Sequence, residues 1–295
     1  MSLSAASHGS GPRRASLCVP ATHLDRVRKA LVAGADEVVV DLEDAVPLGE
    51  KDSARDGLRE VDWSDASARG VRVAVRVNAV GTPWCHRDLE AVTAIPALAS
   101  VVVPKVESRA DLDFVERLLA GLEAETGRAD RVGVQALVET ATGLAGLAGI
   151  VSRPSRLESL VLGYADLGAS LGRQGVVLQD WVPAQHALVV AARAVGVDAI
   201  DGPHLGVADD DAFRAATTHA ARFGFDGKWV IHPRQVDAVV AGFTPAPEQV
   251  AYAERVLAAL EDAAADGRGA VQLDGQLLDE AMAVAARRTL ARVGR

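Results

Sequence analysis

The chain has 295 residues, of which 49% are apolar, and a formal net charge of −9 at pH 7. This length suits either two domains or a single barrel of about 250 residues with a large core. The acidic balance argues against nucleic acid or an anionic membrane surface as the main partner, and no apolar run is long enough to span a membrane. Cys18 and Cys85 lack metal-type spacing, which favours a reducing cytoplasm without a disulfide framework.

Apolar segments typical of buried strands alternate with helix-like segments through most of the chain. The predicted strands are Ser16–Val19, Glu37–Asp41, Arg72–Asn78, Ser100–Pro104, Val132–Glu139, Leu160–Gly163, Val197–Asp201 and Trp229–His232. Helices are predicted between nearly all of them, as at Leu24–Ala33, Ala110–Glu125, Ala184–Val195 and Asp210–Phe223. Eight strands with intervening helices over about 230 residues favour a (β/α)8 TIM barrel over an open sheet, and the lack of G-x-G-x-x-G after the first strand weakens a dinucleotide-binding fold.

The two ends of the chain differ from this pattern. Residues 1–12 are rich in Ser, Ala and Gly and lack the apolar segment of a signal peptide, so we expect a disordered leader there and the barrel over 13–244. Residues 245–295 are predicted to form a C-terminal helical lid with helices at Glu248–Ala265 and Leu277–Val293. The alternative is a tail that packs under the barrel, and composition does not choose between the two.

Three acidic side chains stand where predicted strands end. Asp41, Glu139 and Asp166 each follow a Val/Leu-rich run, and the carboxyl ends of strands are where α/β folds build their sites. Glu139 and Asp166 follow neighbouring strands, so their oxygens can meet on one hard cation such as Mg²⁺, with Mn²⁺ as a substitute. No Cys or His cluster surrounds them in the sequence, which disfavours zinc. The alternative is three unrelated helix caps.

Other charged residues near the strand ends belong to the same candidate site. Asp44 lies in an acid-rich stretch that needs a compensating cation, unless the stretch is a solvated loop before a helix. Arg76 either pairs with an acid at the barrel mouth or binds a substrate carboxylate or developing oxyanion. Lys105 is expected to pair with Glu107 or another acid, with a Schiff base as the weaker alternative. His232 either performs acid/base chemistry or anchors its loop.

Seven short motifs follow one another along the chain. They are Val39-Val-Asp-Leu-Glu-Asp-Ala-Val46, Val75-Arg-Val-Asn-Ala-Val-Gly-Thr-Pro-Trp84, Val103-Pro-Lys-Val-Glu107, Leu137-Val-Glu-Thr-Ala-Thr-Gly143, Gly163-Tyr-Ala-Asp-Leu-Gly168, Asp201-Gly-Pro203 and Gly227-Lys-Trp-Val-Ile-His-Pro-Arg-Gln-Val236. Each is weak alone. Together, in this order and from Ser16 to Arg288, the chain resembles the citrate lyase β-subunit/malyl-CoA lyase family of Mg²⁺-dependent CoA-ester lyases.

The resemblance implies a TIM barrel that forms a homotrimer or hexamer and acts on a CoA thioester and a 2-oxo acid with Mg²⁺. It implies that Glu139 and Asp166 bind the metal and that Asp41 lies near metal-bound water. A catalytic aspartate that enters from the lid of an adjacent subunit matches Asp279. The expected catalytic residues are Asp279, Arg76, Asp44 and Asp41, and the expected substrate contacts are Arg76, Lys29, His23, Ala165 and His232.

One departure from the family affects the expected CoA contacts. After the first strand the family usually has P-G-[DS]-R, whose arginine approaches the CoA phosphates, whereas this chain has Pro20-Ala-Thr-His23. Lys29 still matches the basic residue of the helix that follows. The departure leaves open weaker or rearranged CoA recognition, another thioester, or a substrate without CoA.

The family resemblance, together with the residues at the strand ends, implies a Mg²⁺-dependent lyase that cleaves a carbon–carbon bond in a carboxylated 3-hydroxyacyl-CoA. Malyl-CoA or methylmalyl-CoA is the expected type, and it yields acetyl- or propionyl-CoA plus glyoxylate. Asp279 is expected to exchange the proton of the thioester α-carbon, and Asp44 or a water held by Asp41 to take the hydroxyl proton. The alternatives are a variant that also hydrolyses the thioester to malate, an aldolase without CoA, and a citryl-CoA-type subunit of a larger complex.

Overall fold

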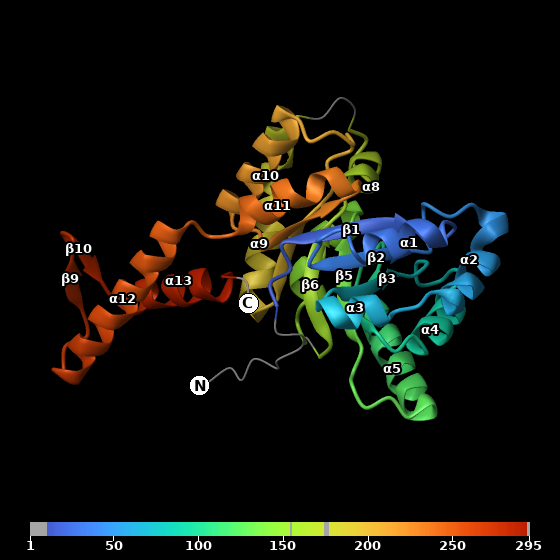
Figure 1. The fold of residues 1–295 in the computed structure, drawn as a ribbon, viewed down its shortest axis with the longest axis horizontal. Helices are drawn as coiled ribbons and strands as arrows, with labels where there is room; N and C mark the ends of the chain where they lie inside the picture. The colour runs from blue at the N-terminus through green and yellow to red at the C-terminus, as the bar shows by residue number, and fades with distance from the viewer. Residues whose placement is uncertain (1–10, 154, 174–176, 294–295) are drawn as a thin grey trace. The chain divides into compact units, whose positions relative to one another are not determined.

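Eight parallel strands close into a barrel in chain order, with β1 paired to both β2 and β8 (Figure 1). The computed structural model describes residues 11–153, 155–173 and 177–293, so the predicted leader lies almost entirely outside the described residues. The strands are β1 (Ala15–Pro20), β2 (Glu37–Asp41), β3 (Arg72–Arg76), β4 (Leu98–Val103), β5 (Gly133–Val138), β6 (Leu157–Leu162), β7 (Asp198–Asp201) and β8 (Gly227–Val230). The predicted TIM barrel is confirmed.

Helices lie between successive strands and cover the outside of the barrel, and one more follows β8 (Figure 1). They are α1 (Leu24–Ala30), α2 (Lys51–Gly57), α3 (Ser64–Arg69), α4 (Cys85–Thr93), α5 (Arg109–Thr126), α6 (Ala141–Ala145), α7 (Leu147–Ile150), α8 (Tyr164–Ser170), α9 (Val182–Val195), α10 (Asp211–Phe223) and α11 (Val236–Phe243), with short 3₁₀ turns at Leu48–Glu50, Leu58–Glu60, Leu178–Trp181 and Pro233–Gln235. The longest of these, α5, begins with a capping box between Ser108 and Asp111 and ends at Gly127 in the left-handed conformation.

A layer of small and branched side chains fills the inside of the barrel. Each strand contributes one member, and the layer consists of Cys18, Val39, Ala74, Val102, Leu137, Val161, Ile200 and Trp229. Most of these side chains have no solvent exposure, as expected for a barrel whose interior is packed rather than open. This layer forms a floor below the carboxyl ends of the strands, where polar side chains gather.

The chain divides into two compact units, one that ends at Val240 and one that begins at Ala241. The second unit holds α12 (Pro247–Ala265), a hairpin of β9 (Val271–Leu273) and β10 (Gln276–Leu278), and α13 (Glu280–Ala291). Its own core joins Ala253 and Val256 of α12 to Leu278 and Ala286. No helix within the described residues is both long and apolar enough to cross a membrane.

The predicted last helix, Leu277–Val293, begins too early. The structure has a hairpin over this start, because Asp274 and Gly275 both take positive φ angles, 50° and 82°, as a two-residue hairpin turn requires. The apolar and polar residues of Val271–Leu273 alternate before this Asp-Gly pair, and an Asp-Gly pair is a typical two-residue hairpin turn. The helix therefore starts at Glu280, with Asp279 as its N-cap.

Candidate active site

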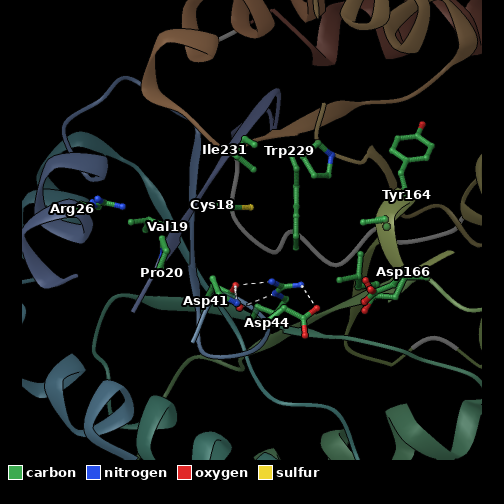
Figure 2. A pocket seen from close by; sticks show the side chains of 17 residues that line it. Cys18, Val19, Pro20, Arg26, Asp41, Asp44, Tyr164, Asp166, Trp229 and Ile231 are labelled. Carbon is green, nitrogen blue, oxygen red and sulfur yellow. Dashed lines mark hydrogen bonds and ion pairs between the residues drawn. The ribbon is translucent and has the colours of Figure 1, made fainter. Parts of the chain in front are cut away.

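A cavity of about 430 Å³ lies at the carboxyl ends of the strands (Figure 2). The residues that line it come from most of the strands or the loops that follow them, and are Cys18, Val19, Pro20, Arg26, Asp41, Asp44, Ala45, Arg76, Leu137, Glu139, Gly163, Tyr164, Ala165, Asp166, Pro203, Trp229 and Ile231. The structure thus brings six of the predicted site residues to one cavity, namely Asp41, Asp44, Arg76, Glu139, Ala165 and Asp166.

Arg76 is held by the acidic stretch that follows β2. Its Nε and Nη2 donate to the two carboxylate oxygens of Asp41 at 2.8 and 2.5 Å, and its Nη1 lies 2.9 Å from Glu43 Oε2. The register of the barrel explains the first pair, since Asp41 and Arg76 are aligned partners on β2 and β3. Asp41 also accepts the backbone N–H groups of Glu43 and Ala45. Its oxygens are therefore engaged in orienting the guanidinium and the loop.

Asp44 differs from Asp41 because its carboxylate is mostly accessible. Its side chain is 57% exposed, and its Oδ2 lies 3.4 Å from Lys105 Nζ and 4.0 Å from Arg76 Nη1. Partial burial tends to raise the pKa of Asp44, but contact with Glu43 and the charges of Lys105 and Arg76 outweigh this, so the pKa lies below its usual range. Asp44 is thus an ionised carboxylate that faces the cavity.

Lys105 places its ammonium group among four carboxylates. Its Nζ lies 3.1 Å from Asp166 Oδ2 and 3.9 Å from Glu139 Oε1, in addition to Asp44 and a close contact with Glu43. Burial lowers the pKa of Lys105, but the hydrogen bond and charge of Glu43 outweigh this and raise it. The charged amine fits the predicted pairing with an acid at the mouth, and it is not the neutral amine that a Schiff base requires.

The backbone at Lys105 also contributes to the site. Lys105 has φ of 52°, a left-handed conformation that is strained for a residue with a side chain. In this conformation its N–H donates to Glu139 Oε1 at 3.0 Å. The strained residue therefore supports a carboxylate of the site with both its backbone and its side chain.

Glu139 is the most strongly perturbed acid in the cavity. Burial raises its pKa to about 8, because the lowering by the charge of Lys105 is smaller and the charge of Glu43 adds to the rise. Gly163 makes this close packing feasible, since a Cβ at that position would lie 2.6 Å from both Cβ and Oε2 of Glu139. A cation bound next to Glu139 would offset this cost of ionisation, so the residue suits a metal ligand.

The residues present fit a magnesium ion. Glu139 and Asp166 supply two carboxylates at the ends of adjacent strands, and buried Oδ2 of Asp166 accepts no hydrogen bond in the described chain although Lys105 Nζ lies 3.1 Å away. Within the described residues no group of three or more His, Cys, Asp or Glu side chains is arranged as a metal site. Mg²⁺ commonly takes one or two protein carboxylates and fills its other positions with water and substrate, so a two-carboxylate site suits it better than zinc.

Four predicted site residues do not line the cavity. His23 and Lys29 are exposed on or before α1, and His232 accepts the N–H of Arg234 at 3.1 Å, which is the loop-anchoring alternative. Asp279 lies in the second unit, where its Oδ1 accepts the N–H groups of the first turn of α13. The roles predicted for these four residues in substrate binding and catalysis are not tested by the structure and stay predictions.

Arg26 was not among the predicted site residues. It lies on α1, one turn after His23, and it lines the cavity on the side away from Asp166 (Figure 2). No hydrogen bond or ion pair joins its guanidinium to another residue of the described chain. The only signal in the sequence that could have identified Arg26 is the helical period, because Arg26 lies three residues after His23 and residues three apart share a helix face.

Comparison with known proteins places these features in a family. The model of the HpcH/HpaI aldolase/citrate lyase family matches residues 14–233. An L-malyl-CoA/beta-methylmalyl-CoA lyase of Cereibacter sphaeroides is 33% identical over 292 residues, which cover 91% of this chain and 90% of the relative. A (3S)-malyl-CoA thioesterase of the same species is 35% identical over 97% of this chain and 96% of its own length.

A solved structure is similar to this chain over nearly its whole length. The protein CitE of Mycobacterium tuberculosis in complex with magnesium, acetoacetate and coenzyme A is 34% identical to this chain, with a TM-score of 0.75. The similarity covers 98% of this chain and 100% of CitE.

Proposed function

Because the chain belongs to the HpcH/HpaI aldolase/citrate lyase family, we propose that it is a magnesium-dependent carbon–carbon lyase that acts on malyl-CoA or methylmalyl-CoA. The products are acetyl-CoA or propionyl-CoA and glyoxylate. One observation carries the proposal. Glu139, Asp166 and Arg76 line the same cavity at the barrel mouth. The cavity therefore offers two carboxylates that can bind a metal ion and a guanidinium that is held by Asp41.

When bound by Glu139 and Asp166, Mg²⁺ supplies Lewis-acid polarisation of the 2-oxo acid oxygens. The guanidinium of Arg76 is oriented by Asp41 before substrate arrives, so it costs little reorganisation to stabilise charge on the oxygen that becomes the glyoxylate carbonyl. Because Asp41 has its oxygens occupied, Asp44 is the better candidate to accept the hydroxyl proton. The bond between the hydroxyl-bearing carbon and the thioester α-carbon then breaks.

The electron pair of that bond passes to the thioester α-carbon, which must gain a proton to give acetyl-CoA. We assign this proton transfer to Asp279 of a neighbouring copy, as part of the same proposal. Asp279 N-caps α13 and its side chain is exposed, so it is available to another subunit. The proposal includes a homotrimer or hexamer in the cytoplasm.

In the same proposal, the protein binds the acyl-CoA through the phosphate groups of the coenzyme. Arg26 supplies the cation there, in place of the arginine that the loop after β1 lacks. Lys29 lies one turn further along α1, and His23 stands at its start. Ala165 and His232 remain the other proposed contacts.

A substrate screen tests this function. The purified full chain is incubated with Mg²⁺ and a series of CoA thioesters, and any released 2-oxo acid is trapped with phenylhydrazine. The proposal expects glyoxylate and acetyl-CoA from malyl-CoA, and loss of the signal with a chelator. Cleavage of a CoA-free hydroxy acid instead would indicate an aldolase.

A second candidate function is hydrolysis of (3S)-malyl-CoA to malate and CoA. It is favoured by the thioesterase of Cereibacter sphaeroides, which matches this chain at 35% identity over 97% of its length. The same assay separates the two functions. Free CoA and malate without glyoxylate indicate the thioesterase, whereas acetyl-CoA and glyoxylate indicate the lyase.

A further inference from the structure

Three motifs of the chain meet in a buried network that the proposed chemistry does not use. Lys228 of β8 donates to Asp201 Oδ2 at 2.5 Å and to the carbonyl of Gly202 at 2.6 Å. Tyr164, the first residue of α8, donates its hydroxyl to the other oxygen of Asp201. Gln185 of α9 then donates to Tyr164 Oη at 2.7 Å. The network thus joins β7, β8, α8 and α9.

The central ion pair is almost fully buried. The side chains of Lys228 and Asp201 are 2% and 3% exposed. Burial of two charges costs about as much as their attraction returns, and an apolar pair often serves stability equally well. The pair is therefore better explained by what it positions than by the stability it provides.

Tyr164 is the residue that the network positions. Its ring packs against Trp181 with centroids 5.1 Å apart, and Gly202 approaches it so closely that a Cβ there would lie 2.8 Å from Tyr164 Cδ2. The same Cβ would also lie 2.1 Å from the carbonyl oxygen of Leu162, so glycine is required at this point. Both the ring and the hydroxyl of Tyr164 are thus held in place.

Asp166 depends on this anchor because little else holds it. It lies two residues after Tyr164 in the first turn of α8, whose N-cap Gly163 provides no side-chain hydrogen bond. Within the described residues its Oδ2 accepts no hydrogen bond, and its one ion-pair partner is Lys105, at 3.1 Å. The position of its carboxylate therefore depends on the placement of the α8 backbone and on this single ion pair.

We propose that Tyr164, Asp201 and Lys228 are positioning residues that fix α8 and thereby set the affinity of Glu139 and Asp166 for a divalent cation. The inference rests on the proposed function, since it requires these two acids to hold the metal. Partners that orient metal ligands from outside the coordination shell commonly change metal affinity by about 10–100-fold.

The test uses Tyr164→Phe, which removes the hydroxyl and keeps the ring. Binding of Mn²⁺ to the purified full chain, without substrate, is followed by electron paramagnetic resonance of the free ion. We expect the dissociation constant for Mn²⁺ to rise by about 10–100-fold. Half-maximal activity should require correspondingly more Mg²⁺, with much of the rate recovered at saturating metal. An unchanged Mn²⁺ dissociation constant would overturn the inference.

Two further variants make the result specific. The double variant Asp201→Leu/Lys228→Met replaces the buried ion pair by an apolar pair, so it should retain the fold while it weakens Mn²⁺ binding. If it folds and binds Mn²⁺ normally, the network does not position α8. Glu123→Gln breaks the buried pair with Arg156, whose members do not line the cavity, and should lower thermal stability without a change in Mn²⁺ affinity.

Glu139→Gln separates this inference from the proposed function. If Glu139→Gln abolishes Mn²⁺ binding and Tyr164→Phe does not affect it, the metal pair is correct and the positioning role is wrong. If Glu139→Gln leaves Mn²⁺ binding intact, the metal pair itself is wrong.

Discussion

Replacement of Glu139 by Gln should make the metal-free protein more stable near pH 8 while it destroys metal binding. Glu139 is buried at 3% exposure, and burial raises the pKa of its carboxyl to about 8 from an ordinary 4.5. Gln has nearly the same shape but never ionises. The variant therefore removes the free-energy cost of a charged carboxylate in this cavity.

The sign and size of the effect follow from proton linkage. Between pH 4.5 and about 8 the unfolded chain has lost the Glu139 proton and the folded chain has kept it, so folding stability falls as pH rises. The slope is about 1.4 kcal/mol per pH unit, which gives an upper limit of about 5 kcal/mol across the whole window. From about pH 5.5 to pH 8 the wild type should lose about 3 kcal/mol relative to Glu139→Gln.

Urea unfolding in the presence of a chelator measures this difference at both pH values. Glu123→Gln is the matched control. Burial tends to raise the pKa of Glu123, but its bonds to Arg156 and to the N–H of Val132 lower it overall, so its stabilising contribution is complete above pH 4.5 and constant across the window. Addition of Mg²⁺ should stabilise the wild type at pH 8 and leave Glu139→Gln unchanged. If the free energy of unfolding changes with pH equally in the wild type and in Glu139→Gln, the argument that ionisation of the buried Glu139 carboxyl destabilises the folded protein is refuted.

Three other changes test the remaining parts of the site. Arg76→Lys keeps the charge but loses the planar fork, so kcat/KM should fall by about 100-fold or more, whereas a change in thermal stability alone would make Arg76 a structural partner only. Arg26→Ala should raise KM for a CoA thioester by about 10-fold, more at low salt, while its control Arg28→Ala, on the same helix but outside the cavity, has little effect; equal effects of the two would remove Arg26 from the phosphate site. Mixed oligomers of Asp279→Asn and Glu139→Gln subunits, with exchange verified by mass, should regain part of the activity that each lacks alone; inactive mixtures would show that Asp279 does not serve a neighbouring barrel.

The barrel could be predicted because each strand is a local apolar pattern with a clear end. Glu37–Asp41 coincides with β2, and other predicted strands differ from the structure by a few residues at their ends. The last helix was the exception, since Leu277 and Leu278 fit the apolar face of a helix, whereas the turn at Asp274-Gly275 places them in a hairpin strand.

The sequence by itself determined which residue types stand at the strand ends, and so determined that Asp41, Glu139 and Asp166 would share the mouth of a barrel. Only the tertiary structure decided how the charges there are partnered. Lys105 lies among acids that follow three different strands, and Lys228 pairs with Asp201 on the adjacent strand. These pairings depend on the order and register of the strands, because parallel pairing brings side chains far apart in the sequence to the same end of the barrel.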